Sequence, residues 1–189
     1  VAAVRTHLLT PVDDPVEVVR RYALDHAQPG DVLAIGESPL AVMQGRFRHP
    51  SEVRVSWLTH RLCYLLSGTG SLGTAPGLQT LIDLVGLRRV LWALARGATG
   101  KLAGRSGDFY RTLGDQSRLI DDVTGTLPPY DRFLVLGPAR ADEVARSITA
   151  ATGVAVAVVD ANDLGFVDVV GASEGVDHAL VAAALRRNP

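Results

Sequence analysis

The strongest constraint on the fold is an uninterrupted apolar run, Val154 to Val159, which ends at Asp160. A run of this length without a polar residue is typical of a strand buried in a sheet. Before it, Arg140 to Thr152 has the pattern of a helix closed by Gly153, and Arg132 to Leu136 predicts another strand. Phe166 to Val170 could form one more strand, followed by a terminal helix, so the last third predicts alternating strands and helices.

The first fifty residues give a similar pattern. Asp14 is a good N-cap and Pro15 suits the first helical position, which predicts a helix running to about His26. Asp31 to Gly36 predicts a buried strand. Two further short strands are expected, at Val4 to Leu9 and at Leu40 to Met43.

The middle of the chain has helical periodicity, interrupted by glycine-rich segments. We therefore predict an α+β fold with a mixed sheet and an inserted helical lobe. The sheet core is expected from residues 1–50 and 115–189, and the lobe from residues 51–114.

Composition and charge exclude several classes of protein. The 189 residues are 47% hydrophobic and 21% charged, and the formal net charge is −1, which argues against sequence-independent binding of nucleic acid. Cys63 is the single cysteine and lies in an apolar run, so a disulfide within the chain and a cysteine zinc site are excluded. No apolar stretch is long enough to span a membrane and no signal peptide is evident, which predicts a cytoplasmic protein. The first residue is not Met, so a trimmed N-terminus is expected.

The acidic segment after the apolar run is the first candidate site. Asp160, Asn162 and Asp163 follow a strand at the sheet edge where α/β proteins commonly bind ligands. Mg²⁺ prefers such oxygen ligands, and one or two carboxylates with substrate phosphates are sufficient. The alternative is an Asx-turn, in which these side chains bond their own backbone.

Asp121 and Asp122 form a second acidic candidate, after the apolar Leu119 and Ile120. Adjacent residues of a strand point to opposite faces, so one of the two aspartates is expected to face a given site. A metal ligand and a helix cap are both compatible with the pair.

A glycine-rich segment from Gly97 to Arg111 carries the cations Lys101, Arg105 and Arg111. Backbone N–H groups exposed by glycine, beside cations, can bind phosphate, whereas the alternative is a solvated loop. The spacing differs from the Walker pattern, and Leu102 stands where a hydroxyl should meet Mg²⁺. No nucleophile elbow or metal-binding histidine spacing is present, and no catalytic residue is assigned.

Four stretches in order resemble the coenzyme F420-0:gamma-glutamyl ligase family. They are Gly30 to Arg46, Leu119 to Asp121, Phe133 to Ile148, and Val156 to Asp163. The resemblance covers about the first 50 residues and the last 70. Two departures are the absence of Lys before Gly45-Arg46 and the absence of an Asn-Gly-Arg element after Asp160.

The resemblance implies a two-subdomain α+β chain, an intertwined homodimer, and GTP-dependent attachment of L-glutamate to a carboxylate acceptor through an acyl phosphate. It also implies Mn²⁺ or Mg²⁺ held by the residues that match the family's metal-binding aspartates, Asp121 and Asp160. Arg46, Lys101 or Arg105 would orient phosphates. Two other hypotheses are a non-catalytic paralogue that binds a metal or phosphorylated ligand, and a Rossmann-like enzyme, against which stands the lack of a glycine-rich turn after the first strand.

Overall fold

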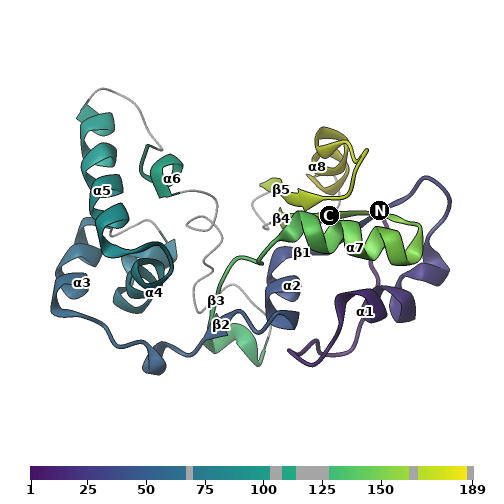
Figure 1. Ribbon diagram of the computed structural model, residues 1–189, viewed down its shortest axis with the longest axis horizontal. Coiled ribbons are helices and arrows are strands. Elements are labelled where there is room, and N and C mark those ends of the chain that lie inside the picture. The colour runs from purple at the N-terminus through teal and green to yellow at the C-terminus, as the bar shows by residue number, and fades with distance from the viewer. Residues whose placement is uncertain (67–69, 103–107, 114–127, 162–165, 187–189) are drawn as a thin grey trace. The chain divides into compact units, whose positions relative to one another are not determined.

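The computed structural model describes residues 1–66, 70–102, 108–113, 128–161 and 166–186 of this α+β protein (Figure 1). The chain forms two units. Unit 1 combines Val1–Arg46 with Pro138–Pro189, and unit 2 comprises Phe47–Gly137. The predicted lobe, residues 51–114, lies within unit 2.

A three-stranded mixed sheet forms the centre of the described part of unit 1. Its strands are β1 (Val32–Gly36), β4 (Ala155–Ala161) and β5 (Val167–Ala172), in the order β1-β4-β5. β1 pairs with β4 in parallel, and β4 pairs with β5 antiparallel, with an irregularity between Val158 and Val159. The apolar run is thus confirmed as the central strand, paired on both sides. Its residues from Val156 to Val159 are buried because helices cover both faces of the sheet.

Among the described residues, four α-helices surround this sheet: α1 (Pro15–Tyr22), α2 (Glu37–Met43), α7 (Ala141–Thr152) and α8 (His178–Arg186). α2 and α7 pack on the face that carries Val156 and Val158, and α1 packs on α7. α8 covers the opposite face, which carries Ala157 and Val159.

The predicted ends of two helices are confirmed. Asp14 caps α1 by accepting hydrogen bonds from the N–H groups of Val16 and Glu17, with Pro15 at the first position. Gly153 ends α7 in the left-handed conformation with φ of 77°. α1 stops at Tyr22, and the predicted extension to His26 is a separate 3₁₀ turn, Leu24–His26.

Two predicted strands of unit 1 are wrong. Val4 to Leu9 forms no regular element, since no strand of the described chain pairs with it. Leu40 to Met43 belongs to α2, which begins after Gly36 and accommodates Pro39 in its first turn. All four residues of this run are buried, so the sequence shows no apolar periodicity that would distinguish a helix from a strand.

Unit 2 is mostly helical. Its helices are α3 (Trp57–Leu62), α4 (Ala75–Val85), α5 (Leu87–Leu102) and α6 (Asp108–Leu113), and a short antiparallel pair joins β2 (Phe47–Arg48) to β3 (Leu134–Val135). Short 3₁₀ turns lie at Pro50–Glu52, Cys63–Leu66 (η3), Gly70–Gly73 (η4) and Tyr130–Arg132. Leu78, Leu81 and Val90 are fully buried in its core, which also holds Cys63, as expected for an inert thiol.

A polar chain fixes the start of α3 against α4. The Gln79 side-chain oxygen accepts hydrogen bonds from the Ser56 N–H at 3.0 Å and the Thr59 hydroxyl at 2.6 Å. The Gln79 amide donates to Asp83 at 3.0 Å, and Asp83 pairs with Arg48 at 3.0 Å. The polar side chains of this hydrogen-bond network therefore satisfy each other where α3 meets α4.

The expected phosphate-binding loop is partly helical. Gly97 to Leu102 forms the end of α5, where backbone N–H groups bond within the helix and cannot cradle an anion. Gly97 has a packing role, because a Cβ there would lie 3.1 Å from the Cβ of Phe109 in α6. Residues 103–107 lie outside the described part of the chain.

None of the described helices combines the length and the apolar composition that a bilayer crossing requires.

Candidate functional site at the carboxyl edge of the sheet

The parallel pair of strands defines a carboxyl edge in unit 1. Gly36, the last residue of β1, lies opposite Val159 in β4, so the chain leaves β1 at the level where β4 reaches Asp160. In open α/β sheets this edge is the usual place for ligands. Asp160 is half-buried there, at the end of the apolar run.

Asp160 is directly opposite a second aspartate, Asp168, in the antiparallel register of β4 and β5. Residues in this relation point to the same face, with Cβ atoms about 4.5–5.5 Å apart. Two carboxylates at this spacing repel each other, and a cation close to both would offset the repulsion. Asp168 Oδ1 also accepts a hydrogen bond from the Val169 N–H at 3.0 Å. The strand register therefore creates a place where a cation would be favoured.

The alternation of side chains places this pair on one face of the sheet. Val158 packs with α2 and α7, and Val159 packs with α8. Asp160 comes two residues after Val158, so it points to the α2 side, as does Asp168.

A third carboxylate, that of Glu37, lies at the same edge as the first residue of α2. Only 6% of this residue is exposed, which is unusual for glutamate. Among the residues that the structure describes, however, no three His, Cys, Asp or Glu side chains are grouped closely enough to hold a metal ion. The described donor set for a cation is therefore the Asp160–Asp168 pair, to which phosphate or water oxygens would have to be added.

The other predicted site residues are placed only in part. Asp121, Asp122, Asn162, Asp163 and Arg105 lie outside the described residues. For Lys101 in α5 and Arg111 in α6 the helical backbone is described and the side chain is not. The structure therefore does not bring Asp121 and Asp160 together or keep them apart.

Arg46 is described and half-buried, just beyond the end of α2. Its backbone N–H donates to the Ala41 carbonyl at 2.8 Å. The seven residues of α2 separate it from Glu37 by about 10 Å along the helix axis. Arg46 therefore follows the end of α2 remote from the carboxyl edge.

Sequence reasoning missed Asp168. The available signal was one charged residue within the apolar stretch Phe166 to Val170. Its importance depends on its position opposite Asp160, which only the register of β4 and β5 reveals.

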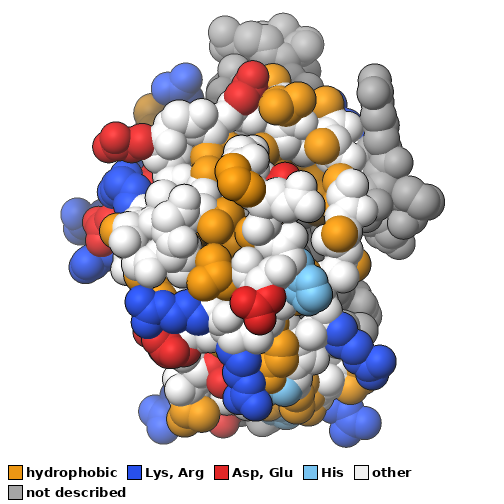
Figure 2. Space-filling view, turned by 90° about the vertical axis from the view of Figure 1, so that its right-hand side faces the viewer, with side chains coloured by type: hydrophobic (Ala, Val, Ile, Leu, Met, Phe, Trp, Pro, Cys, Tyr) orange, Lys and Arg blue, Asp and Glu red, His pale blue; other side chains and the backbone are white. Residues whose placement is uncertain are grey.

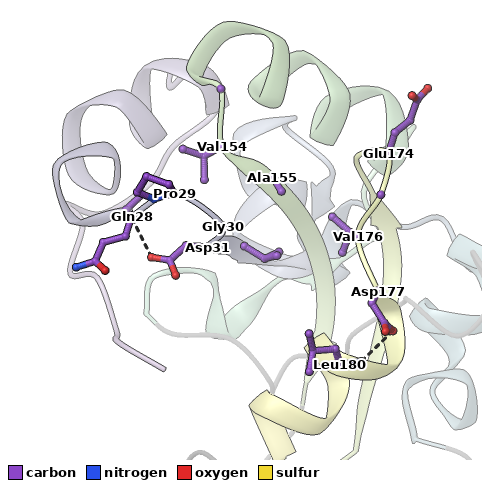
Figure 3. Close-up of a pocket in the computed structure, with 14 residues that line it drawn as sticks. Gln28, Pro29, Gly30, Asp31, Val154, Ala155, Glu174, Val176, Asp177 and Leu180 are labelled. Carbon is purple, nitrogen blue, oxygen red and sulfur yellow. Dashed lines mark hydrogen bonds between the residues drawn. The ribbon is translucent and has the colours of Figure 1, made fainter.

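The described surface also has a depression at the other edge of the sheet, with a volume of about 630 Å³ (Figure 3). It is lined by residues preceding β1 and β4 and by the turn after β5. Two of its acidic residues cap local backbone: Asp31 accepts from the Gln28 N–H, and Asp177 accepts from the N–H groups of Ala179 and Leu180. Glu174 points away from the depression in Figure 3, so we assign no chemistry to this edge.

A separate cluster joins the N-terminal segment to α1. The His7 ring lies 2.9 Å from Asp13 Oδ1 and 2.8 Å from the Tyr22 hydroxyl. The hydroxyl of Thr10, then its backbone N–H, and then His7 hold the pKa of Asp13 below the ordinary value for aspartate. This cluster fastens a segment that has no regular structure of its own.

The lowered pKa of Asp13 predicts a pH-dependent stability. Ionised Asp13 stabilises the fold at pH values above its unfolded pKa, and this contribution is lost as the pH falls through the folded pKa. We therefore expect Asp13→Asn to lower the melting temperature at pH 7 and to flatten its decline between about pH 5 and pH 2. Melting curves across this range test the expectation, with Asp25→Asn as the control; equal slopes for Asp13→Asn and the wild type would contradict it.

Charged side chains of both signs are mixed with hydrophobic ones on the face that Figure 2 presents, in keeping with a net charge of −1. Neither a comparison with protein-family models nor a search of curated proteins finds a match for this chain. The function proposed below is therefore based on the carboxyl edge of the sheet and on the sequence resemblance.

Proposed function

We propose that this chain is a metal- and nucleotide-dependent carboxylate–amine ligase of the F420-0:gamma-glutamyl ligase type. The observation that carries the proposal is the placement of Asp160 opposite Asp168 at the carboxyl edge of the sheet. The sequence resemblance supplies the reaction class, with GTP, L-glutamate and a carboxylate acceptor as substrates. A homodimer and a cytoplasmic setting are part of the same proposal.

The residues at this edge fit a divalent cation. Asp160 and Asp168 supply hard carboxylate oxygens, which Mg²⁺ and Mn²⁺ prefer, and they would hold the ion together with nucleotide phosphates. Asp121 as a metal ligand, with Asp122, Asn162 and Asp163 as secondary ligands, remains a prediction that rests on the sequence and its resemblance to the family. The bound ion would offset negative charge on the phosphates during transfer to the acceptor carboxylate.

The protein's own contribution is orientation. Hydrogen bonds between β4 and β5 fix the two aspartates in register, and the buried Val158 anchors the strand beneath them. Positioning of the glutamate amine beside the activated carboxyl group would then favour displacement of phosphate. Guanidinium and ammonium groups pair with phosphate oxygens, and on this ground the proposed phosphate ligands are Lys101, Arg105 and Arg111. Arg46 is not among them, because it follows the end of α2 remote from the carboxyl edge.

A non-catalytic paralogue that binds a metal or a phosphorylated ligand is the second candidate. It is favoured by the small size of the donor set among the described residues, since two carboxylates are sufficient for binding and no general acid or base is assigned beside them.

One experiment separates these candidates. The melting temperature is measured with GTP, with Mn²⁺ or Mg²⁺, and with both, and phosphate release is measured with and without L-glutamate and a carboxylate acceptor. The ligase should be stabilised by GTP only in the presence of metal, by about 2.7 kcal/mol at a ligand concentration a hundredfold above its Kd, and should release phosphate only when glutamate and acceptor are present. Stabilisation without turnover supports the paralogue, and no effect of any combination contradicts both.

A further inference from the structure

The surface of α3, η3 and α5 in unit 2 exposes large apolar side chains. Trp57 is 72% exposed, Tyr64 75% and Leu65 71%, and in α5 Trp92 is 60% exposed. The first three, together with Arg61, follow helical spacing, so they share one face of α3 and η3. Exposed aromatic and aliphatic residues gathered in this way mark a surface that contacts something else.

The side of α5 opposite the core carries both apolar and basic residues. Val90 and Ala93 pack into unit 2. At the spacing of an α-helix, Trp92 and Arg88 lie near the middle of the outer side, and Leu91, which is 40% exposed, lies at its flank. This arrangement of aromatic, aliphatic and basic residues is typical of a helix lying at the boundary between water and lipid.

The charge on these elements is of one sign. Asp83, in the neighbouring α4, is paired with Arg48 at 3.0 Å. The guanidinium of Arg61 lies 5.5 Å from the centre of the Trp57 ring, so cation and aromatic ring are adjacent on the surface. The segments 57–66 and 87–102 together contain no aspartate or glutamate, and their basic residues are Arg61, Arg88, Arg89, Arg96 and Lys101.

We propose that α3, η3 and α5 form a docking surface for an anionic lipid bilayer. Tryptophan and tyrosine are favoured at the lipid headgroup level, and arginines beside them pair with anionic headgroups. The exposed leucines favour lipid over nucleic acid, because aliphatic side chains cannot stack on bases as aromatic ones do. α3 and α5 both contact α4 in unit 2, so the two exposed faces belong to one cluster of helices.

The two tryptophans of the chain, Trp57 and Trp92, both belong to this surface and report on its environment. The experiment titrates the full chain with vesicles of phosphatidylcholine alone and with vesicles that also contain phosphatidylserine, following tryptophan emission and co-sedimentation. We expect a blue shift and co-sedimentation with the anionic vesicles only, weakened by added salt. The double variant Arg88→Gln, Arg96→Gln should bind about 25-fold more weakly, at roughly fivefold for each arginine.

A matched control is Leu180→Gln on α8, which removes an exposed leucine (66%) from unit 1 and should bind as the wild type does. The proposal is overturned if the anionic vesicles cause no shift, or if the double arginine variant binds them unchanged. It is also overturned if the emission responds to a single-stranded oligonucleotide instead of vesicles. Concentration-dependent self-association lost in Leu91→Gln, without vesicle binding, would overturn it as well and assign the surface to a second copy of the chain.

Discussion

Replacing Gly171 by alanine is expected to destabilise unit 1 by about 3 kcal/mol or more, at the upper end of the cost of overpacking. A Cβ at this position in β5 would lie 2.5 Å from the Cβ of Ala141 and 2.7 Å from backbone atoms of Ala141 and Asp142. The start of α7 is also tied to β5 by the Ala172 N–H, which donates to Asp142 at 2.9 Å. The helix cannot move away without breaking this hydrogen bond and opening the core around Ile148.

Urea unfolding of the Gly171→Ala variant measures this loss as a shift in the midpoint. Gly153→Ala, at the other end of α7, is the control, because its φ of 77° is strained for alanine while no atom lies within 4 Å of the added Cβ. That control should cost about 1 kcal/mol. The double variant Gly171→Ala, Ala141→Gly should recover only part of the lost stability, since the contacts with backbone atoms of residues 141 and 142 remain. Equal losses for Gly171→Ala and Gly153→Ala would contradict the close packing of α7 on β5.

Local chemistry made several elements predictable. The start of α1 follows from Asp14 and Pro15, and the end of α7 follows from Gly153, because caps act over a few neighbouring residues. The central strand β4 was predictable because a run buried on both faces has no polar residue until Asp160.

Elements that depend on distant partners were not predictable in the same way. All residues from Leu40 to Met43 in α2 are buried, so the sequence lacks the alternation of apolar and polar residues that would identify a helix. Val4 to Leu9 has strand-like residues, and no strand of the described chain pairs with it. The glycines at the end of α5 suggested a loop, and Gly97 is there because α6 packs closely on it.

The same distinction between local and distant determinants applies to the two aspartates of the candidate site. Asp160 could be identified from its place at the end of an apolar strand, which is a local property. Asp168 could not, because its relation to Asp160 is created by the antiparallel return of β5 and by the register shift between Val158 and Val159. The role of a charged residue in a short apolar strand depends on which residue lies opposite to it in the neighbouring strand.

Replacing Asp160 or Asp168 by asparagine is expected to abolish the stabilisation by Mn²⁺ or Mg²⁺. At a hundredfold excess of ligand over its Kd that stabilisation is about 2.7 kcal/mol in the wild type. Each substitution removes one of two carboxylates that lie opposite each other in the β4–β5 register, and an amide oxygen is a weaker ligand for a hard cation. Without metal, Asp168→Asn should raise the stability by about 0.2–1 kcal/mol, because it removes repulsion between like charges.

A substitution that lowers the stability with metal and raises it without metal distinguishes a cation site from an ordinary pair of surface aspartates. Melting temperatures of the wild type, Asp160→Asn and Asp168→Asn are compared with and without metal, in each case with GTP present and absent. Glu174→Gln is the matched control, since it removes one negative charge from the turn after β5, at the opposite edge of the same sheet, and it should retain the metal response of the wild type. If both aspartate variants keep that response, the cation does not bind between β4 and β5, and the proposed chemistry loses its site. If the metal response disappears in both variants while the wild type releases no phosphate, binding without catalysis is the function that the pair supports.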